Sequence, residues 1–376
     1  MLNKSIVYSV GMAHIVIDSR ELRTSTGRYV ERLLHYLQII DSENNYTVLL
    51  KPADIDGWAT TNPNFKKVAC PHKEFTVAEQ TKLKKQIESL RPGLVHFTLP
   101  QQPANYKGKV VTTIHDLTTL RFTNPDKNIL VFKFKQNVYR WLMKKVARKS
   151  VYVLTGAEFV KNDVAKFAKI DPEKIIVTYE AADPIEDPAE PVQDLVGLDF
   201  IMYVGRPTPH KNLDRLVEAF RRVQTNNPNL WLVLAGRKDR NYERFAKKLK
   251  KQGIVNVFFT DYVSEGQLRW LYENTRLYVF PSLSEGFGLP GLEAMVQGAP
   301  VASSNATCLP EVYGEAAIYF DPMNVDEMAS TLQKVLSDEN LRSDLIAKGL
   351  AQATKYSWQR MAEQTLEVYK NALDNH

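Results

Sequence analysis

The sequence predicts an α/β protein made of two doubly wound, parallel-sheet (Rossmann-like) domains that face each other across a cleft. Short apolar runs alternate with amphipathic helical stretches, which is typical of parallel sheets covered by helices on both faces. A segment rich in proline and acidic residues, 183–191, interrupts this alternation, which then restarts. The 376 residues also exceed the usual size of a single hydrophobic core. Sheets of this kind bind ligands at the carboxyl ends of their strands, so the cleft is the expected site.

The first half of the chain opens on an apolar, β-branched run that ends at Asp18. Further runs of the same kind, bounded by turn residues, predict strands at residues 14–18, 46–50, 94–98, 110–114, 151–155 and 175–179. Between these runs, apolar residues recur at helical spacing and predict helices at residues 27–40, 77–90, 127–149 and 158–168.

The second half repeats the pattern and closes on a long amphipathic helix, 357–373. Its apolar runs predict strands at residues 200–204, 230–235, 255–259, 277–280, 300–304 and 317–320. Helical spacing predicts helices at residues 212–225, 242–252, 265–273, 290–297, 325–337 and 340–354.

Composition narrows the class of protein. No apolar run approaches the roughly 20 residues of a membrane span, and the N-terminus has no signal-peptide pattern. Cys70 and Cys308 stand in no metal or redox spacing, which fits a reducing compartment, so we expect a cytoplasmic protein. The net charge of +6 indicates an anionic partner.

Much of the positive charge gathers in the helix predicted at 127–149. Its lysines and arginines interleave with apolar residues, of which 134, 138, 141 and 142 follow helical spacing. One interpretation is a solvated helix that packs its apolar stripe on its own domain. The other is docking to an anionic membrane surface, with the protein peripheral at the inner membrane face. No recognition motif for nucleic acid accompanies the charge, so we expect no nucleic-acid partner.

The most informative local pattern is a glycine-rich turn between the strand at 277–280 and the next helix. Glu285 and Glu293 flank Gly286 and Gly288 there. Helix N-termini bind phosphate because their first N–H groups have no intrahelical partner, and carboxylates accept hydrogen bonds from sugar or ribose hydroxyls. The combination indicates a nucleotide sugar. The spacing also satisfies the dinucleotide fingerprint of dehydrogenases, with Glu311 as the downstream acid. Pro290, the charge of Glu293 and the position of Glu311 beyond the next strand disfavour that alternative.

Three other strand ends carry candidate residues. Gly205, Arg206 and Lys211 follow the strand at 200–204 at a helix entrance, a pattern that favours a diphosphate. His115 ends the strand at 110–114, where it either bonds a sugar hydroxyl near the reaction centre or serves a structural role. Gly27 opens the first helix and permits backbone approach to a phosphate or sugar.

The carboxylate pair Asp54 and Asp56 is better explained as turn chemistry, since it stands between Pro52 and Gly57. No other residues have metal-ligand spacing, and the chain has no phosphate-binding loop or nucleophile elbow. We therefore expect no metal and no cofactor.

With these motifs placed, the chain resembles family-4 retaining glycosyltransferases of the GT-B fold along nearly its whole length. Among them it is most similar to bacterial mannosyl- or rhamnosyltransferases of surface polysaccharide assembly. The resemblance rests on the following segments: Ile17-Asp18-Ser19-Arg20, Gly27-Arg28-Tyr29, Thr113-Ile114-His115-Asp116-Leu117, Gly205-Arg206…Lys211-Asn212, Glu285-Gly286-Phe287-Gly288-Leu289-Pro290-Gly291-Leu292-Glu293 and Tyr356-Ser357-Trp358.

The resemblance implies a role for each of these residues. Arg206 and Lys211 would neutralise the donor diphosphate, and His115 would lie beside the transferred sugar. Glu285 would bind that sugar with the backbone N–H groups of Phe287, Gly288 and Leu289, while Glu293 would bond the ribose. Gly27 would belong to the loop that closes on the donor. We place base recognition at Arg237 and Tyr262, at two strand ends that face the cleft.

The resemblance also implies the organisation of the chain and its reaction. An acceptor-side domain would span 1–182, a linker 183–198 and a nucleotide-sugar-binding domain 199–355, and a helix at 356–376 would return to the first domain. The reaction would move a hexose, with GDP-mannose as the best candidate donor, to a glycan or polyprenyl-diphosphate-linked acceptor. The anomeric configuration would be retained and no metal used. A nucleotide-sugar epimerase, a phosphorylase and a non-catalytic nucleotide-sugar-binding protein of the same fold are the alternatives.

Overall fold

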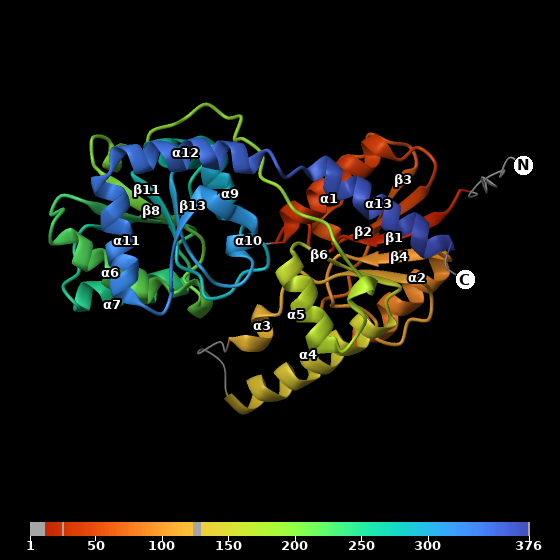
Figure 1. Ribbon diagram of the computed structural model, residues 1–376. Coiled ribbons are helices and arrows are strands. Elements are labelled where there is room, and N and C mark those ends of the chain that lie inside the picture. Colours follow the sequence, from red (N-terminus) through yellow and green to blue (C-terminus); the bar gives the residue numbers. More distant parts are fainter. Residues whose placement is uncertain (1–11, 25, 123–128, 375–376) are drawn as a thin grey trace, which may run out of the picture.

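The protein consists of two lobes, each built around one parallel sheet, as the computed structural model shows for residues 12–24, 26–122 and 129–374 (Figure 1). The sheet of the first lobe has seven strands in the order β3-β2-β1-β4-β5-β6-β7. Its strands are β1 (His14–Asp18), β2 (Asn45–Leu50), β3 (Phe65–Ala69), β4 (Leu94–Phe97), β5 (Val110–Thr113), β6 (Tyr152–Thr155) and β7 (Ile175–Val177). Its helices are α1 (Gly27–Ile40), α2 (Lys84–Leu90), α3 (Thr118–Arg121), α4 (Ile129–Lys149) and α5 (Glu158–Ala168).

The second lobe has six strands in the order β10-β9-β8-β11-β12-β13. These are β8 (Phe200–Val204), β9 (Trp231–Ala235), β10 (Val257–Phe259), β11 (Leu277–Phe280), β12 (Val301–Ser304) and β13 (Ala317–Phe320). The helices are α6 (Leu213–Gln224), α7 (Arg240–Lys251), α8 (Glu265–Asn274), α9 (Leu289–Val296), α10 (Leu309–Tyr313), α11 (Val325–Ser337) and α12 (Glu339–Ala353), and α13 (Trp358–Asp374) closes the chain.

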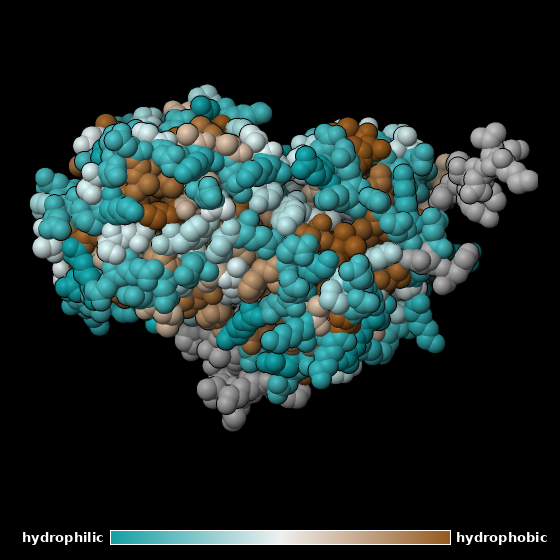
Figure 2. Space-filling view, viewed as in Figure 1, coloured by the Kyte–Doolittle hydropathy of each residue, from teal (hydrophilic) through white to brown (hydrophobic). Residues whose placement is uncertain are grey.

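Both sheets are parallel, as predicted, and the order of each reverses beside its first strand. Such a reversal creates a crevice at the carboxyl ends of the strands, where ligands bind in open α/β sheets. The two lobes touch: one continuous hydrophobic cluster includes Ile114 and Val160 of the first lobe and Phe287 of the second. In the space-filling view, side chains close over the gap that the ribbons leave between the lobes (Figure 2).

The long helix α13 crosses back onto the first lobe, which confirms the fold predicted for the C-terminal helix. It packs against α1, and Trp358 and Tyr369 are buried in the core of the first lobe (Figure 1). The hydroxyl of Tyr369 lies 2.6 Å from Nδ1 of His96, whose Nε2 lies 2.8 Å from the hydroxyl of Thr113. His96 is fully buried and connects the returning helix to β4 and β5.

The strand β3 was not predicted. It forms the edge of the first sheet, and Phe65 is its only buried residue. Lys66 and Lys67 are exposed there, a common protection of edge strands against pairing with other chains. Because it buries so little apolar surface, its sequence lacks the continuous apolar run by which the other strands were recognised.

The basic helix α4 differs in part from its prediction. Leu142, Met143, Val146 and Ala147 pack into the first lobe, whereas Val138 and Trp141 of the predicted apolar stripe are exposed. The side chains at 129–134, and residues 127 and 128, lie outside the described residues. Among the described residues, none of the helices combines the length and the apolar character needed to cross a membrane.

Candidate active site between the lobes

The glycine-rich turn lies at the carboxyl end of β11, in the crevice of the second sheet, and leads into α9. Gly288 is the N-cap of α9 and has a φ of 98°, a backbone conformation that favours glycine. Within the described part of the chain, the N–H groups of Phe287, Gly288 and Leu289 have no hydrogen-bond acceptor. They are donors at a helix N-terminus, where an anionic or hydroxyl-bearing ligand is favoured.

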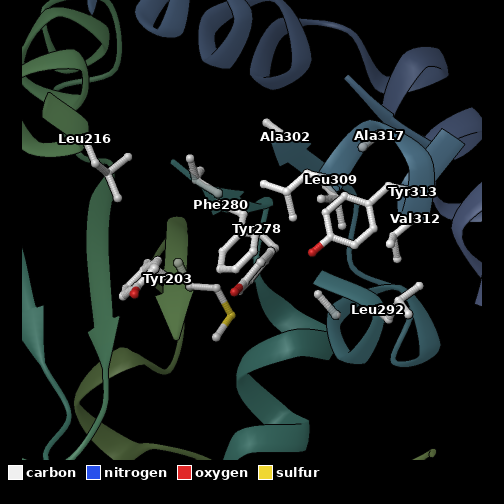
Figure 3. Packing of buried hydrophobic residues seen from close by; sticks show 14 of the residues in the cluster. Tyr203, Leu216, Tyr278, Phe280, Leu292, Ala302, Leu309, Val312, Tyr313 and Ala317 are labelled. Atoms are coloured by element: carbon white, nitrogen blue, oxygen red, sulfur yellow. The ribbon is translucent and has the colours of Figure 1, made fainter. Parts of the chain in front are cut away.

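Aromatic residues hold this turn in place from below. Tyr313 of α10 donates its hydroxyl to the carbonyl of Gly288. Figure 3 shows Tyr278 and Phe280 of β11 close together, between Tyr203 of β8 and Tyr313 of α10. All four side chains are fully buried. These buried side chains and the bond from Tyr313 hold the backbone of the turn in place. The free N–H groups of the turn therefore keep their orientation without a ligand.

Glu285 and Lys211 form an ion pair in this crevice. Lys211 Nζ lies 2.6 Å from Glu285 Oε1 and 5.4 Å from the centre of the Phe280 ring. Both side chains are more than four-fifths buried. The structure thus brings together two residues that come from separate motifs of the sequence. In the same loop, burial and the charge of Lys211 lower the pKa of His210, so its imidazole is neutral near pH 7.

Three of the predicted donor-side residues have exposed side chains. The side chain of Arg206 is exposed and forms no ion pair with any described residue. Arg237 and Tyr262, placed here as base-recognition candidates, are also exposed. Their loops meet through an antiparallel bridge between Gly236 and Asp261, so the two side chains come from adjacent loops.

The predicted glycine of the phosphate clamp has its own backbone partners. Gly205 donates its N–H to the carbonyl of Ala235 at 2.9 Å. The hydroxyl of Tyr242 bonds the carbonyl of Gly205. Gly205 thus fixes the loop that follows β8 rather than offering a free backbone group.

His115 lies in the loop after β5, and both of its ring nitrogens face protein groups. Nε2 is 3.2 Å from the carbonyl of Thr98, an acceptor to which this nitrogen donates in the tautomer that carries its proton there. Nδ1 is 3.3 Å from Oε1 of Glu180, a buried carboxylate just after β7. Sequence reasoning missed Glu180, although a carboxylate directly after a strand is the kind of signal that finds such residues. It orients the ring, and Tyr29 packs edge-on against it with 4.8 Å between ring centres.

The two loops with the predicted catalytic residues touch across the cleft. A Cβ atom at Gly286 would clash with the carbonyl oxygen of His115, so only glycine permits this approach. The hydroxyls of Thr118 and Ser284 lie 2.9 Å apart beside it. The structure therefore brings the loop of His115 directly onto the loop of Glu285.

A second contact across the cleft involves Glu293. Its carboxylate forms an ion pair with Arg28, the second residue of α1. A Cβ atom at the preceding residue, Gly27, would clash with the carbonyl of Leu22, so Gly27 lets the loop turn tightly into α1. A ribose that bonds Glu293 would share this carboxylate with Arg28, a residue that the sequence patterns did not single out for the site.

Among the described residues, no group of three or more His, Cys, Asp or Glu side chains is arranged to hold a metal ion. The crevice instead offers fixed N–H donors, an ammonium and two carboxylates on one lobe, and an oriented imidazole on the other. These groups can hold an anionic leaving group and the hydroxyls of a sugar. Two facing parallel-sheet lobes with a site of this kind between them are the features of a GT-B glycosyltransferase.

Comparison with known proteins identifies the family. The model described as "Glycosyltransferase Family 4" matches residues 50–185, and the model described as "Glycosyl transferases group 1" matches residues 192–352. O-antigen chain mannosyltransferase B of Escherichia coli is 30% identical over 277 residues, which are 70% of this chain and 70% of that protein. The chain belongs to the family-4 glycosyltransferases and is a hexosyltransferase.

Two further relatives differ in how much of them the chain covers. O-antigen chain mannosyltransferase RfbU of Salmonella typhimurium is 30% identical over 229 residues, 59% of this chain and 60% of that protein. Serotype-specific mannosyltransferase WbdA of Escherichia coli is 28% identical over 294 residues, which are 74% of this chain. The chain spans only 35% of the length of WbdA.

Solved structures match the fold over nearly the whole chain. Sucrose-phosphate synthase from Thermosynechococcus elongatus superposes with a TM-score of 0.77 at 17% identity, covering 96% of this chain and 99% of that one. WaaG, a glycosyltransferase involved in lipopolysaccharide biosynthesis, gives a TM-score of 0.70 at 16% identity, covering 94% and 99%. These matches agree with the predicted two-lobed GT-B architecture.

Proposed function

We propose that the protein transfers mannose from a nucleoside-diphosphate sugar to a glycan or polyprenyl-diphosphate-linked acceptor, with retention of the anomeric configuration and without a metal. GDP-mannose is the first donor to test, because the relatives reported above are mannosyltransferases. Three similar proteins with that activity also weigh against the epimerase, phosphorylase and non-catalytic alternatives.

The observation that carries this proposal is the ion pair of Lys211 and Glu285 beside the free N–H groups of residues 287–289. A departing diphosphate needs positive charge that is already in place, and Lys211 together with the helix N-terminus supplies it. Arg206, exposed in the loop that follows β8, would add a second cation once a diphosphate binds there. The diphosphate then draws Lys211 partly out of its ion pair with Glu285. The carboxylate of Glu285 accepts hydrogen bonds from hydroxyls of the transferred sugar.

His115 fits a role on the opposite face of that sugar. Its loop touches the loop of Glu285, and Glu180 holds its ring in one orientation. A proton on Nε2 would let the imidazole donate to a sugar hydroxyl when the bond to Thr98 is exchanged. Positive charge that develops at the sugar during a retaining transfer would lie between this imidazole and the departing diphosphate.

A membrane-bound acceptor would bring the first lobe to an anionic bilayer, and α4 offers a surface for that contact. Trp141 is 56% exposed, and Lys145 Nζ lies 4.9 Å from the centre of its ring. Exposed Val138 lies on the same side of the helix, and Lys135 and Arg140 add charge. An exposed aromatic residue among cations is typical of interfacial helices.

The proposal is tested by a thermal-shift panel of nucleoside diphosphates and their sugars, followed by a turnover assay with the donor that stabilises most. Binding to the folded state raises the melting temperature according to affinity. We expect GDP and GDP-mannose to give the largest shifts, and GDP release to depend on added acceptor. Stabilisation by a nucleotide without turnover for any donor would instead favour a binding protein.

A further inference from the structure

Glu311, in the short helix α10 of the second lobe, reaches across to the first lobe. Its Oε1 accepts from the N–H of Glu158 at 2.7 Å, and its Oε2 accepts from the N–H of Phe159 at 2.8 Å. The hydroxyl of Tyr179 donates to Oε1 at 3.0 Å. These three donors all belong to the first lobe, so one carboxylate connects the lobes at three points.

The two N–H groups open helix α5, which has no cap of its own. Its N-cap residue is Ala157, whose extended backbone (φ −155°, ψ 154°) suits a capping residue but whose side chain has no oxygen to accept a hydrogen bond. Glu311 takes the place that a serine or aspartate usually fills, and its negative charge also favours the positive end of the helix dipole. The first lobe is therefore completed at this point by a residue of the second.

The same contact reaches the turn that binds the donor in the proposed function. The ring of Tyr179 packs against Phe287 and Tyr356, with 6.3 and 5.6 Å between ring centres. Phe287 follows Gly286, the residue that touches His115. Burial and, to a smaller extent, the Glu311 carboxylate raise the pKa of the Tyr179 phenol. This hydroxyl therefore stays protonated and keeps donating to Glu311.

We infer that Glu311 is a positioning residue for the transfer reaction: it latches the two lobes together by capping α5, and so sets His115 against the loop of Glu285. Glu311 touches neither of these residues and acts only through the distance between the lobes. A mobile cleft needs contacts that hold when it is closed and release when product leaves. A helix end that is capped from the other lobe is a contact of this kind. When the cleft opens, water can replace the carboxylate at the N–H groups of α5.

The test compares Glu311→Ala with Glu315→Ala, which removes the same charge from an exposed residue four positions on. Spin labels on exposed residues of the two lobes, Lys107 and Gln252, report the interlobe distance without any substrate. We expect Glu311→Ala to lengthen or broaden that distance and to lower kcat/KM for the donor at least tenfold, while Glu315→Ala leaves both unchanged. Equal behaviour of the two variants would overturn the inference.

A second variant separates bridging from simple capping. Ala157→Ser gives α5 a cap within the first lobe, so adding it to Glu311→Ala should restore the melting temperature but not the interlobe distance or kcat/KM. Recovery of all three would show that Glu311 matters only as a local cap, and the inference would fail. If Glu311→Ala does not fold, Glu311→Gln and Tyr179→Phe weaken the same contacts more gently and should shift the distance in the same direction.

The kinetic arm rests on the proposed function, whereas the distance arm does not. Absence of turnover in the wild-type protein with every donor would count against the proposed function. A distance change confined to Glu311→Ala would still support the latch.

Discussion

The ammonium of Lys211 lies 2.6 Å from the carboxylate of Glu285, although 74 positions separate them in the chain. Each residue comes from a loop at the carboxyl end of a strand, after β8 and after β11, and these strands are neighbours in the sheet. Each residue therefore neutralises the other until a ligand brings its own charges and hydroxyls. A diphosphate would draw Lys211 away and leave Glu285 for the sugar.

Replacing either member of this pair should reduce turnover strongly. We expect Lys211→Ala and Glu285→Gln each to lower kcat by about a hundredfold or more, as loss of preorganised charge typically does. In the double variant, kcat should fall by less than the product of the two single-variant factors, because the two residues interact directly. Lys248→Ala is the matched control, since Lys248 pairs with Asp214 at the same 2.6 Å but on an exposed surface. Rates near wild type for Lys211→Ala would refute its assigned role.

Activity should not depend on a divalent metal. In the proposed mechanism the charge of the departing diphosphate is met by Lys211, by Arg206 and by the N-terminus of α9, which do the work that a metal does in other transferases. We therefore expect initial rates with the best donor to be the same in excess chelator and in added Mg²⁺ or Mn²⁺. Strict dependence on an added metal would contradict this prediction.

Because Gly286 contacts the carbonyl of His115, adding a single methyl group at position 286 should lower activity. Gly286→Ala places a Cβ atom against the carbonyl of His115, so the lobes cannot approach as closely, and we expect kcat/KM to fall about tenfold or more. Gly156→Ala is the control in the same cleft, because its added Cβ would lie at an ordinary contact distance of 3.5 Å from Glu180. If the two variants have equal melting temperatures and show a similar, small loss of kcat/KM, the reaction does not require this close approach of the lobes.

Local patterns sufficed for most of the fold, because apolar runs and helical spacing are properties of consecutive residues. The edge strand β3 escaped, since a strand that buries only Phe65 has almost no apolar signal. In the candidate site, Lys211 and Glu285 could be proposed from the sequence because each lies in a motif at a strand end. Arg28, Glu180 and Glu311 were not assigned to their contacts, because those contacts join lobes or loops that are distant in sequence. Glu311 was considered only as the acid of a dinucleotide site, and its position past β12 already opposed that role.

His96 should make the first lobe sensitive to acid. Burial, and to a smaller extent His115, lowers the pKa of His96 to about 3, while an unfolded chain has a pKa near 6.5. Below pH 6.5 the unfolded state therefore takes up a proton that the folded state refuses, and stability falls by up to about 1.4 kcal/mol per pH unit until pH 3. We expect His96→Gln to lower stability at pH 7, because it disturbs the bonds to Tyr369 and Thr113, but to flatten its decline between pH 6.5 and 4.5. Chemical denaturation of both proteins across this range measures the difference, and parallel curves would show that His96 does not cause the decline.

Binding to anionic membranes should depend on the exposed face of α4. Several cations of this helix are already engaged with the first lobe: Lys145 bonds Asn105 at 2.6 Å, and Lys149 bonds the carbonyl of Pro103 at 2.7 Å. Burial lowers the pKa of Lys149 to about 8, which weakens its charge further above that pH. The exposed residues Val138 and Trp141 must then supply much of the affinity, with the remaining cations adding attraction to anionic lipid.

We expect the protein to float with anionic vesicles at low salt and to be released near 1 M salt, where the Debye length falls to about 3 Å. Trp141→Glu should abolish most of the flotation, because it places a negative charge where an aromatic ring would enter the interface. Ile39→Glu changes an exposed apolar residue of α1 in the same way and should have little effect. No flotation of the wild-type protein at low salt, or equal losses from the two substitutions, would mean that α4 packs on its own lobe and has no membrane partner.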